Sequence, residues 1–439
     1  MNLNISTDYN SYTINKSKAS ILLNIKADEL ADDKKSDIGI IIVADRSGSM
    51  YGEKFELLKS SINKIVSNLS SNDIFSLITF DDKINIDYPL NNMKEENKLK
   101  INTIIKELKV GNTTNLSGGL FKAVEQINDY KTFNKDDNRS WNILLLTDGI
   151  ANEGIVDPIK LTNFINKLID SNPLISNTSI YTFGLGSDHN SELLKNISSC
   201  TNSNYYYLEN KDMISTSFGD CLGGLLSIVV QNLELKLDVF DNYTIDKIYT
   251  NYKIKDNVIY IGDLYSEEEK NIIIDIDCNN IESDDILIDK CLKIKIDYFD
   301  LVNIKLISET INSTISREPD LGEMTINKTV LIQKFRLKAI ELMNNMIKMN
   351  NIDLSKSIGE FKSELQKYEL DNDEYCIYIL QKMQDYLNKS KINKVNATHC
   401  LRSNVQEMCL ERAATCDVNN INIYSTGRKN KLAHVFSKC

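Results

Sequence analysis

The sequence predicts an α/β protein in which a Rossmann-like domain, with a mostly parallel central sheet flanked by helices, precedes a β-sandwich domain and a C-terminal helical region. Three features carry this prediction. In the first half, short apolar segments alternate with segments of helical periodicity, which is the pattern of βαβ units. Further along, apolar residues recur at every second position, and near the C-terminus they recur at helical spacing. A chain of 439 residues also exceeds one ordinary domain.

In the first half, composition and spacing place each element. Residues 38–45 are rich in β-branched side chains and end in an acid, which predicts a buried strand. Residues 54–69 carry apolar side chains at helical spacing, and Pro158 stands in the first turn of another helix, where its missing N–H costs nothing. The expected strands are 38–45, 74–80, 141–147, 179–184 and 204–209. The expected helices are 54–69, 94–108, 118–128, 158–170, 191–199 and 212–230.

The remaining segments complete the domain organisation. Further strands are expected at 18–27, 233–239, 258–261, 271–277 and 291–296, and helices from 324, at 354–368 and at 375–387. We therefore expect an N-terminal segment at 1–35, the Rossmann-like domain at 36–219, the sandwich at 220–316 and the helical region at 317–439. The tail from residue 404 is of mixed character, and we expect it to pack in extended form.

Composition excludes several classes of partner. A net charge of −11 argues against nucleic acid and anionic membranes, because both are held by clustered Lys and Arg. We see neither a signal-peptide pattern nor an apolar stretch of bilayer length, and the nine cysteines have no regular spacing, which favours a reducing compartment. We expect a cytoplasmic protein that binds neither nucleic acid nor membrane. The abundance of Asn, Ile and Lys is typical of an AT-rich genome, such as that of a eukaryotic microbe or a large DNA virus.

Five oxygen-bearing side chains stand at the ends of expected strands or in the loops beside them. Asp45, Ser47 and Ser49 follow the first buried strand, Thr114 lies in the loop 112–120, and Asp148 follows the strand 141–147. Loops at the carboxyl ends of parallel strands converge on one crevice, so these side chains can share a site. The set offers only oxygen ligands, which suits Mg²⁺ or Mn²⁺. Singly, each has a structural explanation, since Ser49 and Thr114 can cap helices and Asp148 can belong to a turn.

At these residues the chain resembles the von Willebrand factor A (VWA) family, whose metal-ion-dependent adhesion site has the pattern Asp-x-Ser-x-Ser, a later Thr and a later Asp. The resemblance implies that Asp45, Ser47, Ser49, Thr114 and Asp148 bind the metal. Within the loop, Thr-Asn-Leu-Ser-Gly-Gly-Leu matches the family pattern from Thr114, although the neighbouring Thr113 keeps that choice open.

The resemblance extends beyond this domain. Residues 217–231, 261–265 and 411–415 are similar to the region that follows the VWA domain in eukaryotic relatives, including plant proteins with a RING finger. That arrangement implies that the strand at 18–27 joins the β-sandwich. A RING finger needs paired cysteine ligands, and the chain contains no Cys-x-x-Cys, so ubiquitin-ligase activity is not expected.

Other readings of single motifs are weaker. Asp45 could be a phosphatase nucleophile, but that chemistry requires an acid two residues later, where Ser47 stands. The C-terminal group His399, Cys400, Cys409, Cys416, His434 and Cys439 fits no usual zinc spacing, and core packing explains it better. The run 267–269 is most simply a solvated turn, and the run 205–207 a strand with one buried face.

We expect a non-enzymatic, metal-dependent protein-binding module that holds Mg²⁺ or Mn²⁺ and whose coordination is completed by a carboxylate of a partner protein. The alternative is an interaction scaffold in which partners dock on the sandwich or the helices and the metal is structural. The sequence does not specify the partner or the oligomeric state.

Overall fold

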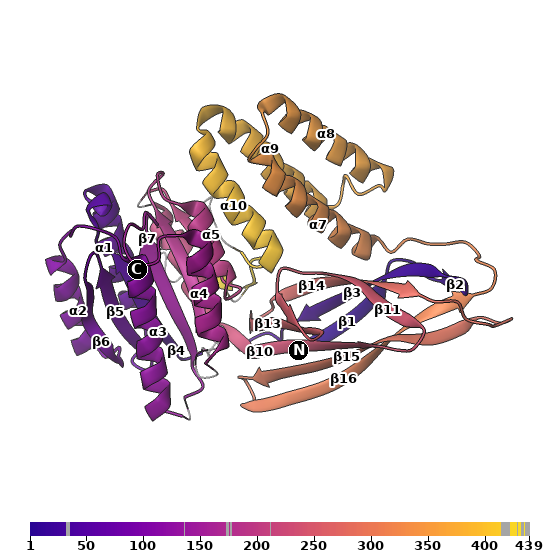
Figure 1. The fold of residues 1–439 in the computed structure, drawn as a ribbon, viewed down its shortest axis with the longest axis horizontal. Coiled ribbons are helices and arrows are strands. Elements are labelled where there is room, and N and C mark those ends of the chain that lie inside the picture. The colour runs from indigo at the N-terminus through magenta and orange to yellow at the C-terminus, as the bar shows by residue number, and fades with distance from the viewer. Residues whose placement is uncertain are drawn as a thin grey trace. The chain divides into compact units, whose positions relative to one another are not determined.

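The computed structural model describes residues 1–31, 36–135, 137–172, 175, 178–210, 212–413, 422–427, 429–431 and 434 (Figure 1). The chain divides into two compact units. The sandwich unit comprises Met1–Leu30, Val229–Ile392 and Met408–Glu411. The α/β unit comprises Ala31–Ile228, Asn393–Glu407 and Arg412–Cys439.

A six-stranded sheet forms the centre of the α/β unit. Its strand order is β6-β5-β4-β7-β8-β9, and every neighbouring pair is parallel except β5 and β6. The strands are β4 (Ile38–Asp45), β5 (Ile74–Phe80), β6 (Ile84–Asn92), β7 (Ser140–Thr147), β8 (Thr178–Leu185) and β9 (Tyr205–Leu208). The prediction of a mostly parallel sheet flanked by helices is confirmed.

Helices cover both faces of this sheet. Ile41 and Val43 of β4 share one apolar cluster with residues of α3, α4 and α5, so these helices lie on one face (Figure 1). Helix α1 contacts β8, α2 and α6. The helices are α1 (Glu53–Asn68), α2 (Glu95–Glu107), α3 (Leu116–Phe133), α4 (Pro158–Asp170), α5 (Ser191–Ser199) and α6 (Asp212–Leu225), with a short 3-10 turn at Gly48–Met50.

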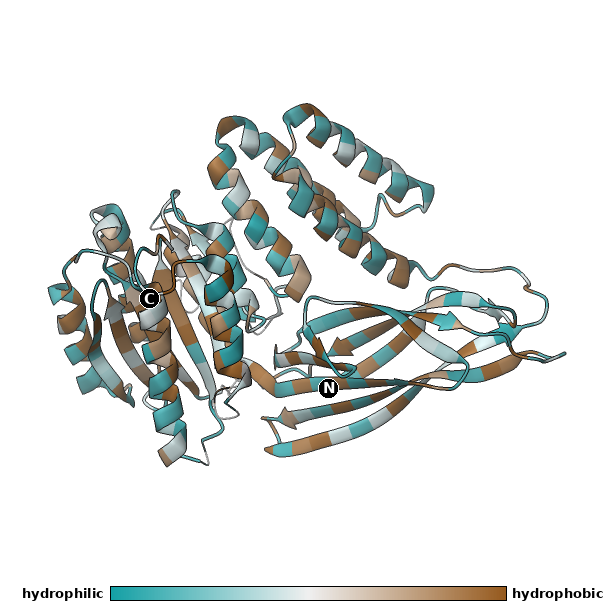
Figure 2. Cartoon of the chain, viewed as in Figure 1, coloured by the Kyte–Doolittle hydropathy of each residue, from teal (hydrophilic) through white to brown (hydrophobic). Residues whose placement is uncertain are grey.

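Burial explains which strands the sequence revealed. Every residue of β4, β5 and β7 is buried, and these strands form apolar stripes in Figure 2. Strand β6 escaped prediction because it is an antiparallel edge strand with a mixed burial pattern and contains Pro89. The run 205–207 is buried on both faces rather than on one, since helices α5 and α6 both contact β9.

The expected helix at 212–230 is too long. Helix α6 ends at Leu225, and β10 (Ile228–Val239) begins three residues later. The β-branched side chains of Ile228, Val229 and Val230 favour the strand, which outweighs the apolar continuity that suggested a helix.

The sandwich unit contains two sheets. One has the order β1-β3-β14-β11 and the other β12-β13-β10-β15-β16-β2. Strand β3 pairs with β14 along ten residues, from Ser17 opposite Cys278 to Lys26 opposite Glu269. The strands are β1 (Asn2–Thr7), β2 (Tyr12–Thr13), β3 (Ser17–Lys26), β11 (Tyr243–Tyr249), β12 (Lys253–Lys255), β13 (Val258–Tyr265), β14 (Glu269–Cys278), β15 (Leu287–Asp300) and β16 (Lys305–Glu318).

The acidic run 267–269 is only partly a solvated turn. Glu268 is buried, and its carboxylate accepts hydrogen bonds from the backbone N–H of Tyr265 at 2.9 Å and from the buried Lys270 Nζ at 2.8 Å. The expectation was wrong for this residue because ion pairing within the fold makes burial of a carboxylate tolerable.

The described residues of the C-terminal region form helices α7 (Lys328–Met346), α8 (Asn351–Lys367), α9 (Glu374–Ile392) and α10 (Lys394–Leu410). Helix α7 packs on β3 and β14, with Val330 beside Leu22 and Ile273. The extended tail expected from residue 404 is wrong as far as residue 410, because α10 continues to Leu410. In the part of the chain that the structure describes, no helix has the length and apolar character needed to cross a membrane.

Candidate metal centre at the carboxyl edge of the parallel sheet

Two adjacent strands deliver the two aspartates. Asp45 is the last residue of β4, and Asp148 directly follows β7, the parallel neighbour of β4. Both side chains are fully buried, at 0% exposure. The parallel pairing therefore brings two carboxylates from distant parts of the sequence to one end of the sheet.

Backbone hydrogen bonds join the three loops that carry the predicted ligands. Gly48 N donates to Asn112 O at 2.8 Å, and Gly111 N donates to Arg46 O at 2.6 Å, so the loop after β4 lies against the loop before α3. Asn152 N and Glu153 N both donate to Thr114 O at 3.1 Å, which joins the loop before α3 to the loop after β7. All five predicted residues thus lie on connected loops at one edge of the sheet.

Asp45 is held by hydrogen bonds on both carboxylate oxygens. Ser47 N donates to Oδ1 at 2.8 Å, and the buried hydroxyl of Thr147 donates to Oδ2. Burial raises the pKa of Asp45 to about 6; the hydrogen bonds from Ser47 and Thr147 oppose this shift, and the charge of Asp148 adds to it. The two aspartates are therefore close enough for their charges to interact.

Ser47 contacts Asp45, and the other hydroxyl-bearing residues lie on the same connected loops. Ser47 Oγ and Ser49 Oγ are 3.1 Å apart, with Ser47 buried and Ser49 exposed. Thr114 is buried, and its N–H donates to Asn152 Oδ1 at 2.7 Å. Within the described residues, the hydroxyl of Thr113 is buried and has no hydrogen-bond partner. Both threonines therefore remain candidates, with Thr114 favoured by the sequence pattern.

Three participants were missed from the sequence. Thr147 orients Asp45, and Lys54 of α1 donates to Asp148 Oδ2 at 3.1 Å while it also contacts Asp188 Oδ1 at 2.7 Å. Lys54 had a signal, because it is the second residue of a helix, where the helix dipole disfavours a positive charge. Asp188 had no such signal in the sequence, since it lies in a loop 134 residues from Lys54 along the chain.

This donor set fits a hard divalent cation. Two buried carboxylates at one edge need positive charge nearby, and hydroxyls can supply neutral oxygen ligands without adding negative charge. The set includes no thiol or imidazole that would favour zinc or copper. When bound, Mg²⁺ or Mn²⁺ would supply open coordination positions to an oxygen of another molecule.

The C-terminal histidines and cysteines form no such centre in the described residues. His399 is buried, and its Nε2 lies 2.9 Å from Ser187 O, while Cys400 packs partly against the apolar core of the α/β unit. Among the described residues, no group of three His, Cys, Asp or Glu side chains could hold a metal. Cys416 and Cys439 lie outside the described residues.

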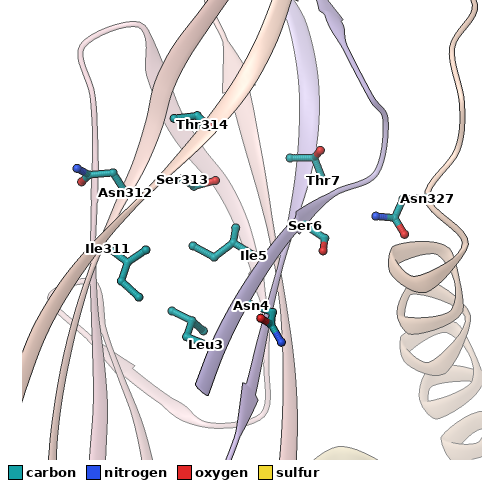
Figure 3. Close-up of a pocket in the computed structure, with 10 residues that line it drawn as sticks. All are labelled: Leu3, Asn4, Ile5, Ser6, Thr7, Ile311, Asn312, Ser313, Thr314 and Asn327. Atoms are coloured by element: carbon teal, nitrogen blue, oxygen red, sulfur yellow. The ribbon is translucent and has the colours of Figure 1, made fainter. Parts of the chain in front are cut away.

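A hollow of about 540 Å³ lies in the sandwich unit between β1 and β16 (Figure 3). Leu3, Ile5 and Ile311 point into the space between the strands, and Asn4 lies on the other side of β1 (Figure 3). None of its lining residues carries a charge, so this hollow is unsuited to binding a metal ion.

The fold and the oxygen-rich edge define a Rossmann-like domain with a candidate cation site at its parallel strand ends. Residues 39–219 match the family model of the von Willebrand factor type A domain, and the chain therefore contains a VWA domain. VWA domains are protein-interaction modules that are typically metal-dependent.

Two curated relatives are similar to about half of the chain. The chain is 29% identical to the uncharacterized protein YfbK of Escherichia coli K12 over 221 residues, which is 49% of this chain and 36% of YfbK. It is 24% identical to the E3 ubiquitin-protein ligase WAV3 of Arabidopsis thaliana over 257 residues, 55% of this chain and 31% of WAV3. The chain thus spans about a third of the length of these two relatives.

Solved structures agree with the fold over most of the chain. The ArnB paralog VWA2 of Sulfolobus acidocaldarius superposes with a TM-score of 0.62 at 18% identity, covering 93% of this chain and 97% of that one. A von Willebrand factor type A protein of Catenulispora acidiphila superposes with a TM-score of 0.62 at 14% identity, covering 87% of this chain and 89% of that one. At these identities the similarity establishes the fold alone.

Proposed function

We propose that the chain is a metal-dependent protein-binding module in which Asp45, Ser47, Ser49, Thr114 and Asp148 hold Mg²⁺ or Mn²⁺, and that a carboxylate of a partner protein completes the coordination. The observation that carries the proposal is the pair of fully buried aspartates at neighbouring strand ends, surrounded by three hydrogen-bonded loops. Burying two carboxylates together is costly unless positive charge compensates them, and among the described residues Lys54 pairs with Asp148 whereas Asp45 has no ion pair.

The proposal includes no catalytic step. A phosphatase of the aspartate-nucleophile type needs a general acid near Asp45, and the side chain two residues later is the hydroxyl of Ser47. Asp45 is also hydrogen-bonded through both oxygens, which suits a fixed ligand better than an attacking group.

The first test measures the metal directly. Isothermal titration of the full chain with Mg²⁺ should show one site, and Asp148→Asn should weaken it on the order of a hundredfold because one anionic ligand is lost. Asp129→Asn is the matched control, since Asp129 is an exposed residue of α3 and its change leaves the site intact. Equal affinity of Asp148→Asn and wild type would refute the proposed ligand set.

The second test asks whether partner binding needs the metal. Proteins captured by the immobilised full chain in Mg²⁺ should be released by EDTA and absent from a parallel capture with Asp148→Asn. Capture that persists in both conditions would contradict a role for the metal in binding.

A scaffold function is the second candidate, and the hollow between β1 and β16 favours it. Here the partner would dock on the sandwich unit while the metal is structural. Thr314→Arg places a long charged side chain at an exposed lining position. Loss of EDTA-resistant capture in this variant would support docking on the sandwich, and unchanged capture would argue against it.

A further inference from the structure

Lys54 places a positive charge directly on one of the proposed ligands. Its Nζ lies 3.1 Å from Asp148 Oδ2 and 2.7 Å from Asp188 Oδ1. The Lys54 side chain is 17% exposed, whereas the Asp148 side chain is fully buried and the Asp188 side chain is 61% exposed. The ammonium therefore sits between a buried carboxylate and a solvated one.

The environment keeps this ammonium charged. Burial by itself lowers the pKa of Lys54, but the hydrogen bond to Asp188 and the charge of Asp148 outweigh burial and raise the pKa above its ordinary value. The hydrogen bond and charge of Lys54 likewise lower the pKa of Asp188, against the opposing effect of burial. The ammonium thus bridges two carboxylates that come from different loops.

We propose that Lys54 is a second cation of the metal centre, which lowers the affinity for the divalent ion and raises the affinity of the loaded site for an acidic ligand. The inference rests on the proposed function and adds a residue that sets the balance between its two binding steps. The ammonium shares Asp148 with the metal, so the two cations repel each other across one carboxylate.

The same charge should act in the opposite direction on a carboxylate ligand. A divalent cation is balanced by the two aspartates, and the nearby ammonium leaves additional positive charge in a site with little solvent. Asp188 offsets this charge only weakly because solvent screens its exposed carboxylate. Lys54 therefore favours an anionic partner group over a neutral oxygen ligand.

Asp188 acts through Lys54 as a positioning residue. Its carboxylate gives the ammonium a second partner, which draws part of the interaction away from Asp148. Without that partner, Lys54 would interact with Asp148 alone, and the metal would compete with a stronger Lys54–Asp148 ion pair for the Asp148 carboxylate. As a single substitution, Asp188→Asn should therefore weaken metal binding. In a chain that also carries Lys54→Met, the same substitution should have a smaller effect.

The test uses two probes on the full chain. Mn²⁺ affinity is measured by titration, and acetate affinity is measured from the water-proton relaxation of bound Mn²⁺, which falls as acetate displaces coordinated water. Lys54→Met, which leaves an unbranched side chain one atom shorter and without charge, should bind Mn²⁺ on the order of tenfold more tightly. The same variant should bind acetate several-fold more weakly, an opposite change that general damage to the site would not produce.

Two control variants separate charge from packing. Lys54→Arg keeps the charge and should bind Mn²⁺ no more tightly than wild type, and Lys64→Met changes a lysine farther along α1 and should leave both affinities unchanged. Tight Mn²⁺ binding by Lys54→Arg, or unchanged or weaker Mn²⁺ binding by Lys54→Met, would overturn the role of Lys54. If wild type itself fails to bind Mn²⁺, the proposed metal centre fails first and this inference fails with it.

Discussion

Acidification should destabilise the α/β unit through His189, which the fold holds in its neutral form. His189 is 4% exposed, and its Nδ1 donates to Gly186 O at 2.7 Å, so Nε2 is the acceptor for the hydroxyl of Tyr205. Its ring centroid lies 4.0 Å from that of His399. Burial lowers the pKa of His189 to about 3, and the charge of His399 contributes in the same direction.

The size and sign of the effect follow from proton linkage. The unfolded chain binds a proton at His189 below a pKa of 6.5, while the native state stays neutral down to about 3. The stabilisation is therefore complete above pH 6.5 and is lost progressively as the pH falls toward 3. At pH 5 the loss from this residue alone is about 2 kcal/mol, from roughly 1.5 pH units at about 1.4 kcal/mol each.

The single tryptophan provides the assay. Trp141 is fully buried in β7, so its fluorescence during urea unfolding reports on the α/β unit. The free energy of unfolding is compared between about pH 7.5 and about pH 5 for wild type and for His189→Asn. Wild type should lose about 2 kcal/mol more than the variant. The subtraction cancels other groups such as Asp45, whose raised pKa stabilises the native state as the pH falls.

His434→Asn is the matched control, because His434 is exposed. This variant should lose as much stability as wild type on acidification. A loss in His189→Asn equal to that of wild type would show that His189 is not the buried neutral group, and the reasoning would be refuted.

Three further substitutions test the contacts around the site and in the sandwich unit. Glu411→Ala removes a buried carboxylate that lies 3.3 Å from Arg336 and should cost about 3–5 kcal/mol in urea unfolding followed by circular dichroism, with Glu411→Gln costing less. Gly111→Ala places a Cβ 1.8 Å from Asp81 Oδ2 and should lower the thermal unfolding midpoint of the α/β unit. Differential scanning calorimetry would measure this midpoint, and an unchanged value would contradict the clash. Thr147→Val removes the hydroxyl that orients the proposed aspartate ligand of β4 and should weaken Mg²⁺ binding about tenfold by titration, whereas equal affinity would exclude this supporting role.

The buried strands were predictable because their sequence pattern depends on burial alone. The β-branched run that forms β4 and the apolar run that forms β7 are wholly buried in the sheet. Both aspartates were found because each comes at the end of such a run, and parallel strands end at a common edge. The edge strand β6 lacked this pattern, since one side of an edge strand meets solvent.

The charged contacts were not predictable from local sequence. Glu268 has the appearance of a solvated acid, but Lys270 accompanies it into the interior. Lys54 stands in the first turn of a helix, where the dipole disfavours a positive charge, but the local sequence does not indicate that α1 carries it to Asp148 and Asp188. In each case the decisive partner comes from the packing of elements, and the charge of a side chain does not specify whether it will find one.

The sequence by itself determined the α/β class and the positions of the main strands along the chain, because periodicity is a local property. It also supplied the five oxygen-bearing residues proposed to hold a metal, through their places at strand ends and in loops and their resemblance to the VWA pattern. Only the tertiary structure decided which groups surround those residues. Thr147 donates a hydrogen bond to Asp45, and Lys54 forms ion pairs with both Asp148 and Asp188. The physical reason is that electrostatic and hydrogen-bonding interactions depend on distances of a few ångströms, and those distances exist only after distant segments have packed together.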